Sequence, residues 1–343
     1  MKIQELQETA AAMTAPGKGI LAMDESTPTI GKRLASVGVD NTHDNRAAYR
    51  ELLLGTDGLS DHVAGAILYD ETIRQDCPDG THFPQLMKNK GIIPGIKVDT
   101  GAKDLAGHPG EKVTEGLDGL RDRLAEYVDL GARFSKWRAV ITIGDGIPSR
   151  ACIEANAHAL ARYAALCQEA GLVPIVEPEV LIDGDHSIER SFDVTVETQR
   201  TVFRELYAQG VAFEGMVLKP SMVISGKNAS NRAGVGQVAE QTLRCLRSTV
   251  PAAVPGVAFL SGGQSDEEAS AHLNAMNEMA ADLHLPWRLT FSYARALQNQ
   301  PMQIWKGHPE NVASARKALL HRARCNSAAS QGRYSPDMER EAA

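Results

Sequence analysis

The residue best placed to take part in a chemical reaction is Lys219, which ends an apolar run of strand length and is followed at once by Pro220. The run at residues 215–218 is suited to a buried parallel strand, and the proline cannot continue the hydrogen bonds of a central strand. A cation buried at that point must be paired or must lose its proton. The pattern therefore predicts an amine nucleophile, and we expect it to attack a carbonyl group.

Other ionisable residues stand near the ends of neighbouring apolar runs. Lys136 lies in one run, Glu177 and Glu179 lie at the end of the next, and Asp24 ends the first. Two carboxylates and two amines in one cavity form a set that can transfer protons. Lys136 is a candidate for a second cation that favours the neutral amine of Lys219, and it can at the same time be the partner of a carboxylate such as Glu177. Asp24 is either a member of this set or the N-cap of the helix that follows it.

A glycine-rich loop indicates an anion site. Ser261, Gly262 and Gly263 follow an apolar run, and the glycines allow backbone N–H groups to close on an anion. The loops after strands seven and eight often bind phosphate in barrel enzymes. Ser292 and Arg295 belong to the second of these loops, so we expect them to complete the clamp.

A second basic cluster consists of Lys32, Arg33 and Lys97, which come from other predicted loops. These side chains either bind a second phosphate or, for Lys32 and Arg33, are ordinary surface charges. The residue types alone leave both interpretations open.

Eight apolar runs of strand length alternate with amphipathic segments of helical length. The runs cover residues 19–24, 63–69, 92–98, 134–143, 173–180, 215–219, 256–260 and 287–293, and the helical segments include residues 117–130, 152–170, 194–209, 235–248 and 267–284. This alternation predicts parallel pairing, and eight units in 343 residues favour a closed (β/α)8 TIM barrel over an open doubly wound sheet. The chemical residues then lie at the carboxyl ends of the strands, where barrel enzymes carry their sites.

The remaining segments complete the predicted organisation. Residues 2–13 have the spacing of a leader helix that stops before Pro16. Residues 26–61 have room for two short helices, at about 29–37 and 42–54, inserted in the first connection. We expect one α/β barrel domain over residues 1–330 and a polar, mobile tail over residues 331–343.

Composition excludes several classes of protein. A formal net charge of −7 with a pI of about 5.8 gives no basic footprint for nucleic acid, and no apolar run is long enough to span a membrane. The five cysteines include no C-x-x-C pair, which argues against a disulfide framework and a cysteine zinc site. The histidines form neither H-E-x-x-H nor H-x-H, which disfavours a catalytic metal. We expect a cytoplasmic protein with reduced thiols.

The motifs at the predicted strand ends closely resemble those of class I fructose-bisphosphate aldolase. They are Leu-Ala-Met-Asp-Glu-Ser-Thr at 21–27, Gly-Ile-Lys-Val-Asp at 95–99, Lys-Trp-Arg at 136–138, Val-Glu-Pro-Glu at 176–179, Leu-Lys-Pro at 218–220, Phe-Leu-Ser-Gly-Gly-Gln-Ser at 259–265 and Ser-Tyr-Ala-Arg-Ala-Leu-Gln at 292–298. They occur in the family's order, and the resemblance runs from the leader helix to about residue 334. It implies a (β/α)8 barrel, usually a homotetramer, that reversibly cleaves fructose 1,6-bisphosphate to dihydroxyacetone phosphate and glyceraldehyde 3-phosphate without a metal or another cofactor.

The resemblance also assigns roles to residues of this chain. It makes Lys219 the Schiff-base lysine and Glu177 the main general acid and base, with Glu179, Lys136 and Asp24 as supporting catalytic groups. It places the phosphate of the keto end at Ser261, Gly262, Gly263, Ser292 and Arg295. It places the other end of the substrate at Ser26, Lys32, Arg33 and Lys97, and it counts Arg138 among the substrate-binding residues.

Two departures from the family and two alternative functions stay open. Many animal members end in a tyrosine that assists proton exchange, whereas this chain ends in Ala343 and its last tyrosine is Tyr334. Ala294 stands where some members have glycine, a change that keeps the backbone N–H. The alternatives are a metal-dependent aldolase and a binding scaffold that kept an aldolase-like barrel. The residues around Lys219 favour the Schiff-base enzyme over both.

Overall fold

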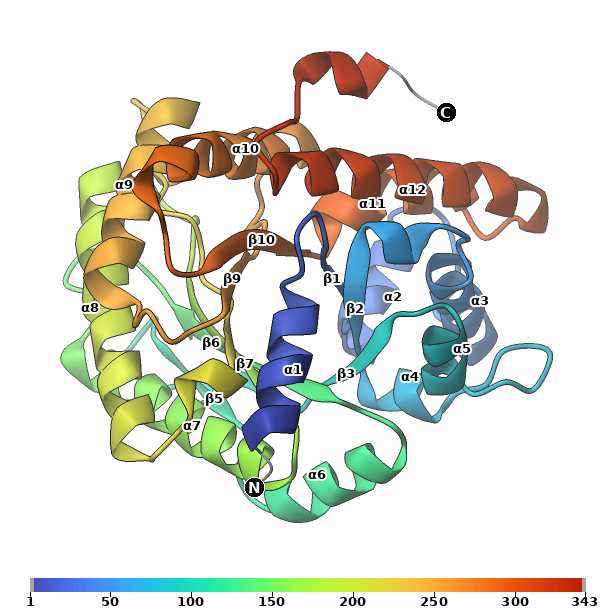
Figure 1. Ribbon diagram of the computed structural model, residues 1–343, viewed down its shortest axis with the longest axis horizontal. Helices are drawn as coiled ribbons and strands as arrows, with labels where there is room; N and C mark the ends of the chain where they lie inside the picture. The colour runs from blue at the N-terminus through green and yellow to red at the C-terminus, as the bar shows by residue number, and fades with distance from the viewer. Residues whose placement is uncertain (1–2, 341–343) are drawn as a thin grey trace.

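The computed structural model describes residues 3–340, and within this range eight parallel strands close into a barrel (Figure 1). The strands are β1 (Gly19–Ala22), β2 (Val63–Leu68), β3 (Ile93–Lys97), β6 (Phe134–Ile141), β7 (Val173–Val180), β8 (Val217–Leu218), β9 (Gly256–Phe259) and β10 (Arg288–Tyr293). They pair around the barrel in the order β1-β10-β9-β8-β7-β6-β3-β2, so strands that follow one another along the chain are neighbours. The predicted (β/α)8 barrel is confirmed.

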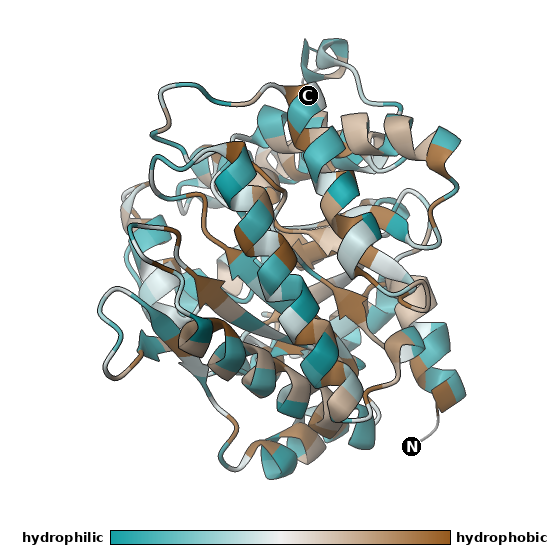
Figure 2. Cartoon of the chain, turned by 90° about the vertical axis from the view of Figure 1, so that its left-hand side faces the viewer, coloured by the Kyte–Doolittle hydropathy of each residue, from teal (hydrophilic) through white to brown (hydrophobic). Residues whose placement is uncertain are grey.

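Helices connect the strands and cover the outside of the barrel. They are α1 (Ile3–Met13), α2 (Thr27–Ala35), α3 (His43–Leu54), α4 (Asp70–Arg74), α5 (Phe83–Asn89), α6 (Leu120–Asp129), α7 (Arg150–Glu169), α8 (Ile188–Ala208), α9 (Val235–Thr249), α10 (Asp266–Leu283), α11 (Arg295–Trp305) and α12 (Val312–Ala329), with 3-10 turns η1 (Leu59–Asp61), η2 (Phe213–Gly215), η3 (Pro309–Asn311) and η4 (Pro336–Arg340). Brown and teal residues alternate along the outer helices in Figure 2, as expected for helices with one buried face. On α7 that face includes Ile153, Leu160 and Tyr163.

Strand β8 is shorter than its apolar run. Val217 pairs with Ile175 on one side, and Leu218 pairs with Val257 on the other. The backbone N–H of Lys219 still donates to the carbonyl of Val176, with N and O 2.8 Å apart. The next residue is a proline and has no N–H to extend the ladder, so the strand ends at the amine.

Helix α1 closes the amino end of the barrel. It lies in front of the strands in Figure 1, and its buried residues Leu6, Ala10 and Met13 belong to one apolar cluster with Ile20 of β1 and Phe134 of β6. The predicted leader helix is therefore part of the core. Because side chains fill this end, the barrel opens at its carboxyl end.

An antiparallel hairpin of β4 (Gly101–Asp104) and β5 (Lys112–Glu115) was not predicted from the sequence. Its strands are four residues long, and no apolar alternation marks them. Asn156 of α7 fastens the hairpin instead, because its side chain donates to the carbonyl of Lys112 and accepts from the N–H of Thr114. A tertiary contact of this kind leaves no local signal in the sequence.

The tail that the sequence predicts to be mobile makes defined contacts up to Arg340. Tyr334 is buried, and Glu339 of η4 forms an ion pair with Arg322 of α12. Residues 341–343 lie outside the described part of the chain. The mobility of the tail stays a prediction.

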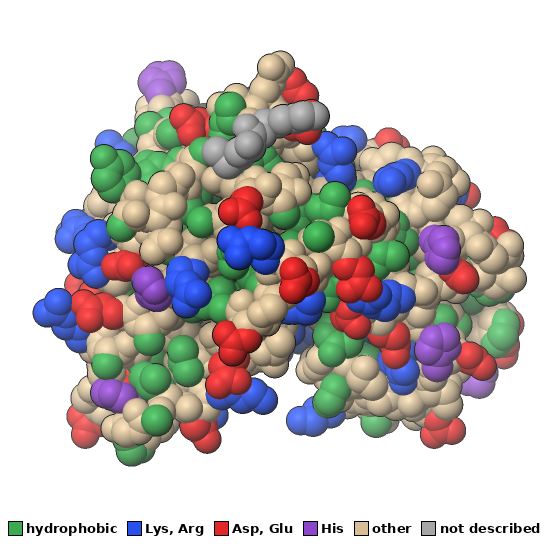
Figure 3. Space-filling view, turned by 90° about the horizontal axis from the view of Figure 1, so that it is seen from below, with side chains coloured by type: hydrophobic (Ala, Val, Ile, Leu, Met, Phe, Trp, Pro, Cys, Tyr) green, Lys and Arg blue, Asp and Glu red, His purple; other side chains and the backbone are tan. Residues whose placement is uncertain are grey.

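The surface carries mixed charge. On the face shown in Figure 3, Lys and Arg side chains lie interspersed with Asp and Glu side chains. Among residues 3–340, no helix is both long enough and apolar enough to cross a bilayer.

Candidate active site

The carboxyl ends of the strands surround a cavity of about 450 Å³. Its lining includes most of the residues that the sequence singles out, namely Asp24, Ser26, Arg33, Lys97, Lys136, Arg138, Glu177, Glu179, Lys219, Ser261, Gly262, Ser292 and Arg295. The ionisable residues predicted at separate strand ends thus meet in one place. Its size suits a small molecule.

Lys219 and Lys136 lie on either side of Glu177 at the centre of the cavity. The Nζ of Lys219 is 3.2 Å from Oε1 of Glu177, and the Nζ of Lys136 is 3.5 Å from Oε2. Lys136 also contacts Asp24, with Nζ and Oδ2 2.6 Å apart. Lys136, Glu177 and Lys219 are each at most 4 % exposed. The two predicted roles of Lys136 are both compatible with this geometry, since it is a cation near Lys219 and a partner of carboxylates.

The strand register explains why these side chains meet. Glu177 and Glu179 are two residues apart on β7, and Lys136 and Arg138 are two apart on β6, so each pair shares one face of its strand. Arg138 is opposite Glu177 in the β6–β7 ladder. Pro178 between the glutamates does not interrupt this strand. The carboxylates therefore point into the barrel opening beside the cations.

Electrostatics fix the charge of Asp24 and Lys136. Burial alone would raise the pKa of the Asp24 carboxyl, but the attraction of Lys136, and then of Lys219, outweighs burial and lowers this pKa to about 2. Burial would likewise lower the pKa of Lys136, yet Asp24 and Glu177 raise it above its ordinary value. Asp24 is consequently an anion and Lys136 a cation at neutral pH.

Arg138 and Glu179 form a further ion pair in the lining of this cavity. The guanidinium of Arg138 donates from Nε to Oε2 of Glu179. Burial opposes the charge of Arg138, but the attraction of Glu179 raises its pKa. Asp99 accepts from the backbone N–H of Arg138 at 3.2 Å and lies 3.0 Å from the Nζ of Lys97. These contacts hold the cations in place around the opening.

The loop after β9 has the geometry of an anion cradle. Gly262 and Gly263 have φ of 58° and 95°, a backbone region that favours glycine. A Cβ at Gly263 would lie 3.3 Å from Nη2 of Arg295, so this glycine lets the guanidinium approach the loop. The hydroxyl of Ser292 is buried and has no hydrogen-bond partner among the described residues. An unpartnered hydroxyl beside an arginine suits an anionic group of a ligand.

The three residues of the second basic cluster, Lys32, Arg33 and Lys97, do not all reach the cavity. Arg33 and Lys97 line the cavity, and Arg33 pairs with Glu25, whereas Lys32 is exposed on α2 and does not line it. The structure thus does not bring Lys32 to the predicted site. Asp24 is not an N-cap, because Ser26 occupies the N-cap of α2.

Sequence reasoning missed residues that support the site without reacting. Gln298 donates to Oε1 of Glu25 at 3.1 Å and to the carbonyl of Ala22 at 2.6 Å. His272 of α10 contacts Gln264 of the loop after β9, with Nδ1 and Oε1 2.6 Å apart. Gln298 and Gln264 stand in the motifs that the sequence brings out, but only their side-chain contacts disclose what they hold.

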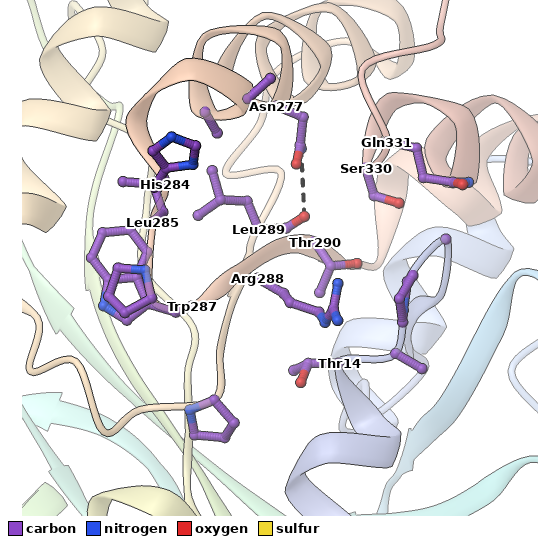
Figure 4. Close-up of a pocket in the computed structure, with 17 residues that line it drawn as sticks. Thr14, Asn277, His284, Leu285, Trp287, Arg288, Leu289, Thr290, Ser330 and Gln331 are labelled. Atoms are coloured by element: carbon purple, nitrogen blue, oxygen red, sulfur yellow. Dashed lines mark hydrogen bonds between the residues drawn. The ribbon is translucent and has the colours of Figure 1, made fainter.

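Another cavity, of about 540 Å³, lies at the amino ends of β9 and β10 (Figure 4). Trp287, Leu285 and Leu289 line it together with Arg288 and His284. Among the described residues that line this cavity there is no carboxylate and no lysine. It therefore lacks the buried lysine and the carboxylates that the other cavity combines, and His284 is the one side chain of its described lining that could exchange a proton at neutral pH.

The fold and the site together define a barrel with a central cavity that combines buried lysines, carboxylates and a glycine-rich loop beside an arginine. The family model described as "Glycolytic: Fructose-bisphosphate aldolase class-I" matches residues 5–343. The chain belongs to the class I fructose-bisphosphate aldolase family. By that membership it is an aldolase, a carbon–carbon lyase.

Individual relatives agree with this membership. The "Probable fructose-bisphosphate aldolase class 1" of Xanthomonas campestris is 60% identical over 97% of this chain and 99% of its own length. "Fructose-bisphosphate aldolase 3, chloroplastic" of Arabidopsis thaliana is 52% identical over 98% of this chain and 85% of its own length. A solved structure of fructose-bisphosphate aldolase from Plasmodium falciparum superposes with a TM-score of 0.95 at 49% identity, covering 97% of this chain and 95% of that chain.

Proposed function

We propose that this chain cleaves fructose 1,6-bisphosphate reversibly, through a Schiff base on Lys219, as a step of glycolysis and gluconeogenesis. The observation that carries the proposal is the contact of the buried Lys219 Nζ with Glu177 at 3.2 Å, inside a cavity that also holds the anion cradle. A nearby carboxylate can take and return the protons that amine chemistry requires.

The residues support a balanced sequence of steps. The neutral amine of Lys219 adds to the ketone carbon, and the resulting carbinolamine loses water after Glu177 protonates its hydroxyl. The protonated imine then accepts the electron pair of the C3–C4 bond as that bond breaks, while a carboxylate takes the proton of the C4 hydroxyl, so the aldehyde leaves and an enamine remains. Return of a proton to C3 restores the imine, and addition of water releases the ketone product and the amine of Lys219. Because the imine polarises the substrate, the proposed reaction needs no cofactor. Lys136 stays cationic beside Asp24 throughout and stabilises the charge that develops near Glu177.

The two phosphates would occupy opposite sides of the cavity. Ser261, Gly262, Gly263, Ser292 and Arg295 would hold the phosphate of the keto end, and Ser26, Arg33, Lys97 and Arg138 would hold or approach the other end. Lys32 lies outside the cavity lining and would act at most through long-range charge.

We also propose that the protein is a cytoplasmic homotetramer, built from one barrel domain at residues 1–330 with a tail at 331–343. Tyr207 of α8 is 79 % exposed, and Met279 and Leu283 of α10 are also exposed, which supports contacts between copies. Two Arabidopsis relatives are named cytosolic. Sedimentation should give four times the chain mass of 36.9 kDa, and a monomer at working concentration would refute the tetramer.

Borohydride trapping tests the proposed chemistry. Reduction in the presence of fructose 1,6-bisphosphate should fix a substrate-derived adduct on Lys219, identified by peptide mass spectrometry. Lys219→Met should give no adduct and no cleavage, while Lys227→Met, which changes an exposed lysine paired with Asp183, should behave like the parent. An unmodified Lys219 during turnover would refute the mechanism. Loss of activity after chelation would favour a metal-dependent aldolase instead.

A further inference from the structure

Three metal-ligating side chains of different types converge outside the active-site cavity, where the tail meets α12. His321 and Cys325 are four residues apart on α12, so they lie on one face of the helix, and Glu339 comes from η4. One potential ligand atom from each lies within 4.8 Å of those of the other two. Neither the family nor the proposed reaction requires this cluster.

The distances suit a small tetrahedral ion. The Nε2 of His321 is 3.7 Å from Sγ of Cys325 and 3.8 Å from Oε2 of Glu339. Zinc binds nitrogen and oxygen at about 2.0–2.1 Å and sulfur at about 2.3 Å, so ligand atoms around a tetrahedral zinc ion are roughly 3.4–3.6 Å apart. The two distances from His321 are within a few tenths of an ångström of those separations, and the third pair of atoms, which lies within 4.8 Å, would close by side-chain rotation on binding.

Neighbouring residues orient the carboxylate. Tyr334 donates its hydroxyl to Oε1 of Glu339 at 2.9 Å, and Nη1 of Arg322 contacts both carboxylate oxygens at 2.5 Å. Arg322 is anchored in turn by the carbonyl of Asp266 and the hydroxyl of Ser270. Oε1 is therefore held by Tyr334 and Arg322, while Oε2 contacts Arg322 and also faces His321. Hydrogen bonds of this kind orient metal ligands in proteins.

We propose that His321, Cys325 and Glu339 bind a zinc ion with water as the fourth ligand, and that the ion fastens the tail to α12. A thiolate, an imidazole and a carboxylate are the ligand types that zinc takes in proteins. The side chains of His321 and Glu339 are 12 % and 14 % exposed, which gives the ion a path from solvent. On binding, the zinc ion displaces the Cys325 thiol proton to solvent and shares Oε2 with Arg322.

The lack of a recognised motif explains why the sequence pointed away from such a site. The ligands combine one helical turn with a residue fourteen positions further on, and no C-x-x-C or H-x-H spacing occurs. Arg322 links the site to Asp266 at the start of α10, which follows the loop after β9. The site itself lies outside the active-site lining, so chelation should loosen the tail, which Arg322 and Tyr334 still contact, without abolishing cleavage.

Metal titration of the full chain, stripped with a chelator, tests the proposal. Calorimetry should show one zinc ion per chain, and cobalt(II) should give a thiolate-to-cobalt charge-transfer band. Cys325→Ser, His321→Gln and Glu339→Gln should each weaken zinc binding by at least about 100-fold, more than the loss of an orienting partner causes. Cys245→Ser, a buried cysteine of α9, should leave binding and the cobalt band unchanged.

The parent protein decides the matter even if a variant fails to fold. Zinc should slow cleavage by trypsin within the tail, at Arg333 or Arg340, in the parent and not in His321→Gln. The absence of a charge-transfer band in the parent, or zinc binding that survives in Cys325→Ser, would overturn the site. If zinc bound but did not protect the tail from trypsin, the proposal that the ion attaches the tail to α12 would be wrong.

Discussion

At the level of single residues, the two central lysines differ in their ionic partners, and we propose different tasks for them on that ground. Among the described residues, Lys136 has two ionic partners, Asp24 and Glu177, whereas Lys219 has Glu177 alone. Asp24 therefore keeps Lys136 charged, and the single shared carboxylate can take a proton from the other amine. This difference in partners supports the proposed assignment of the nucleophile to Lys219.

Replacing Glu177 should show how much the shared carboxylate contributes. Glu177→Gln keeps the shape of the side chain but removes its base, so kcat for cleavage should fall by roughly 10²–10⁴-fold, the usual contribution of a positioned acid or base. Glu179→Gln is the matched control, because Glu179 pairs with Arg138 and should change kcat less. Equal losses in the two variants, measured at saturating substrate, would contradict the assignment.

The Asp24 carboxyl should make stability depend on pH in acid. Its pKa is lowered from 3.8 to about 2, mainly because the attraction of Lys136 and Lys219 outweighs burial. Since the folded-state pKa lies below the unfolded value, the stabilisation is complete above about pH 4 and is lost as the pH falls through 2. The shift corresponds to about 2 kcal/mol.

Urea unfolding of the parent and of Asp24→Asn between about pH 5 and about pH 2 measures this contribution. The free-energy difference between the two proteins should shrink toward the acid end of this range. A difference that stays constant across the range would contradict the linkage.

At the level of elements, the loop after β9 depends on α10 behind it. Gln264 donates to the carbonyl of Ser261 at 3.0 Å, and its Oε1 meets Nδ1 of His272. Burial, which outweighs the attraction of Glu268, lowers the pKa of His272 to about 4. A neutral imidazole can donate from Nδ1 to the amide oxygen, so the helix sets the conformation of the anion cradle.

His272 should destabilise the protein in mild acid. Because its folded-state pKa lies below the unfolded value of 6.5, the unfolded chain binds a proton first, and stability is lost as the pH falls from 6.5 toward 4. His272→Gln should remove up to about 3 kcal/mol of this dependence. Urea unfolding at about pH 7 and about pH 4.5 measures the loss, with the exposed His308→Gln as control. Identical pH profiles of parent and His272→Gln would rule out this role.

The order of elements could be predicted because each strand of the barrel is buried on both sides and reads as an apolar run. Residues 63–69 and 173–180, for example, became β2 and β7 with nearly the same bounds. The hairpin of β4 and β5 could not be predicted, since its short strands lack an apolar run and are held in part by the side chain of Asn156. Pattern alone identifies elements that bury apolar surface, and it misses those held by polar side-chain contacts.

At the level of the whole molecule, the closed barrel brings residues that are far apart in the sequence together around one cavity. The sequence predicted most of the lining because strand ends are visible in it and a closed barrel brings them together. It assigned Lys32 to the site only by resemblance, and the structure leaves this residue exposed on α2 while the next residue, Arg33, enters the lining. Lys32 and Arg33 point in different directions from α2, and the sequence does not specify how this helix is rotated about its axis relative to the barrel.

Substrate binding can be measured apart from catalysis by the amount that the ligand stabilises the folded protein. In a Lys219→Met background, which cannot form the Schiff base, fructose 1,6-bisphosphate at 100 times its Kd should stabilise the folded state by about 2.7 kcal/mol. Adding Arg295→Ala should remove most of this gain, because the guanidinium lies beside the anion cradle. Adding Lys32→Ala should preserve it. Thermal unfolding with and without the sugar bisphosphate gives the comparison, and a loss with Lys32→Ala as large as that with Arg295→Ala would restore Lys32 to the site.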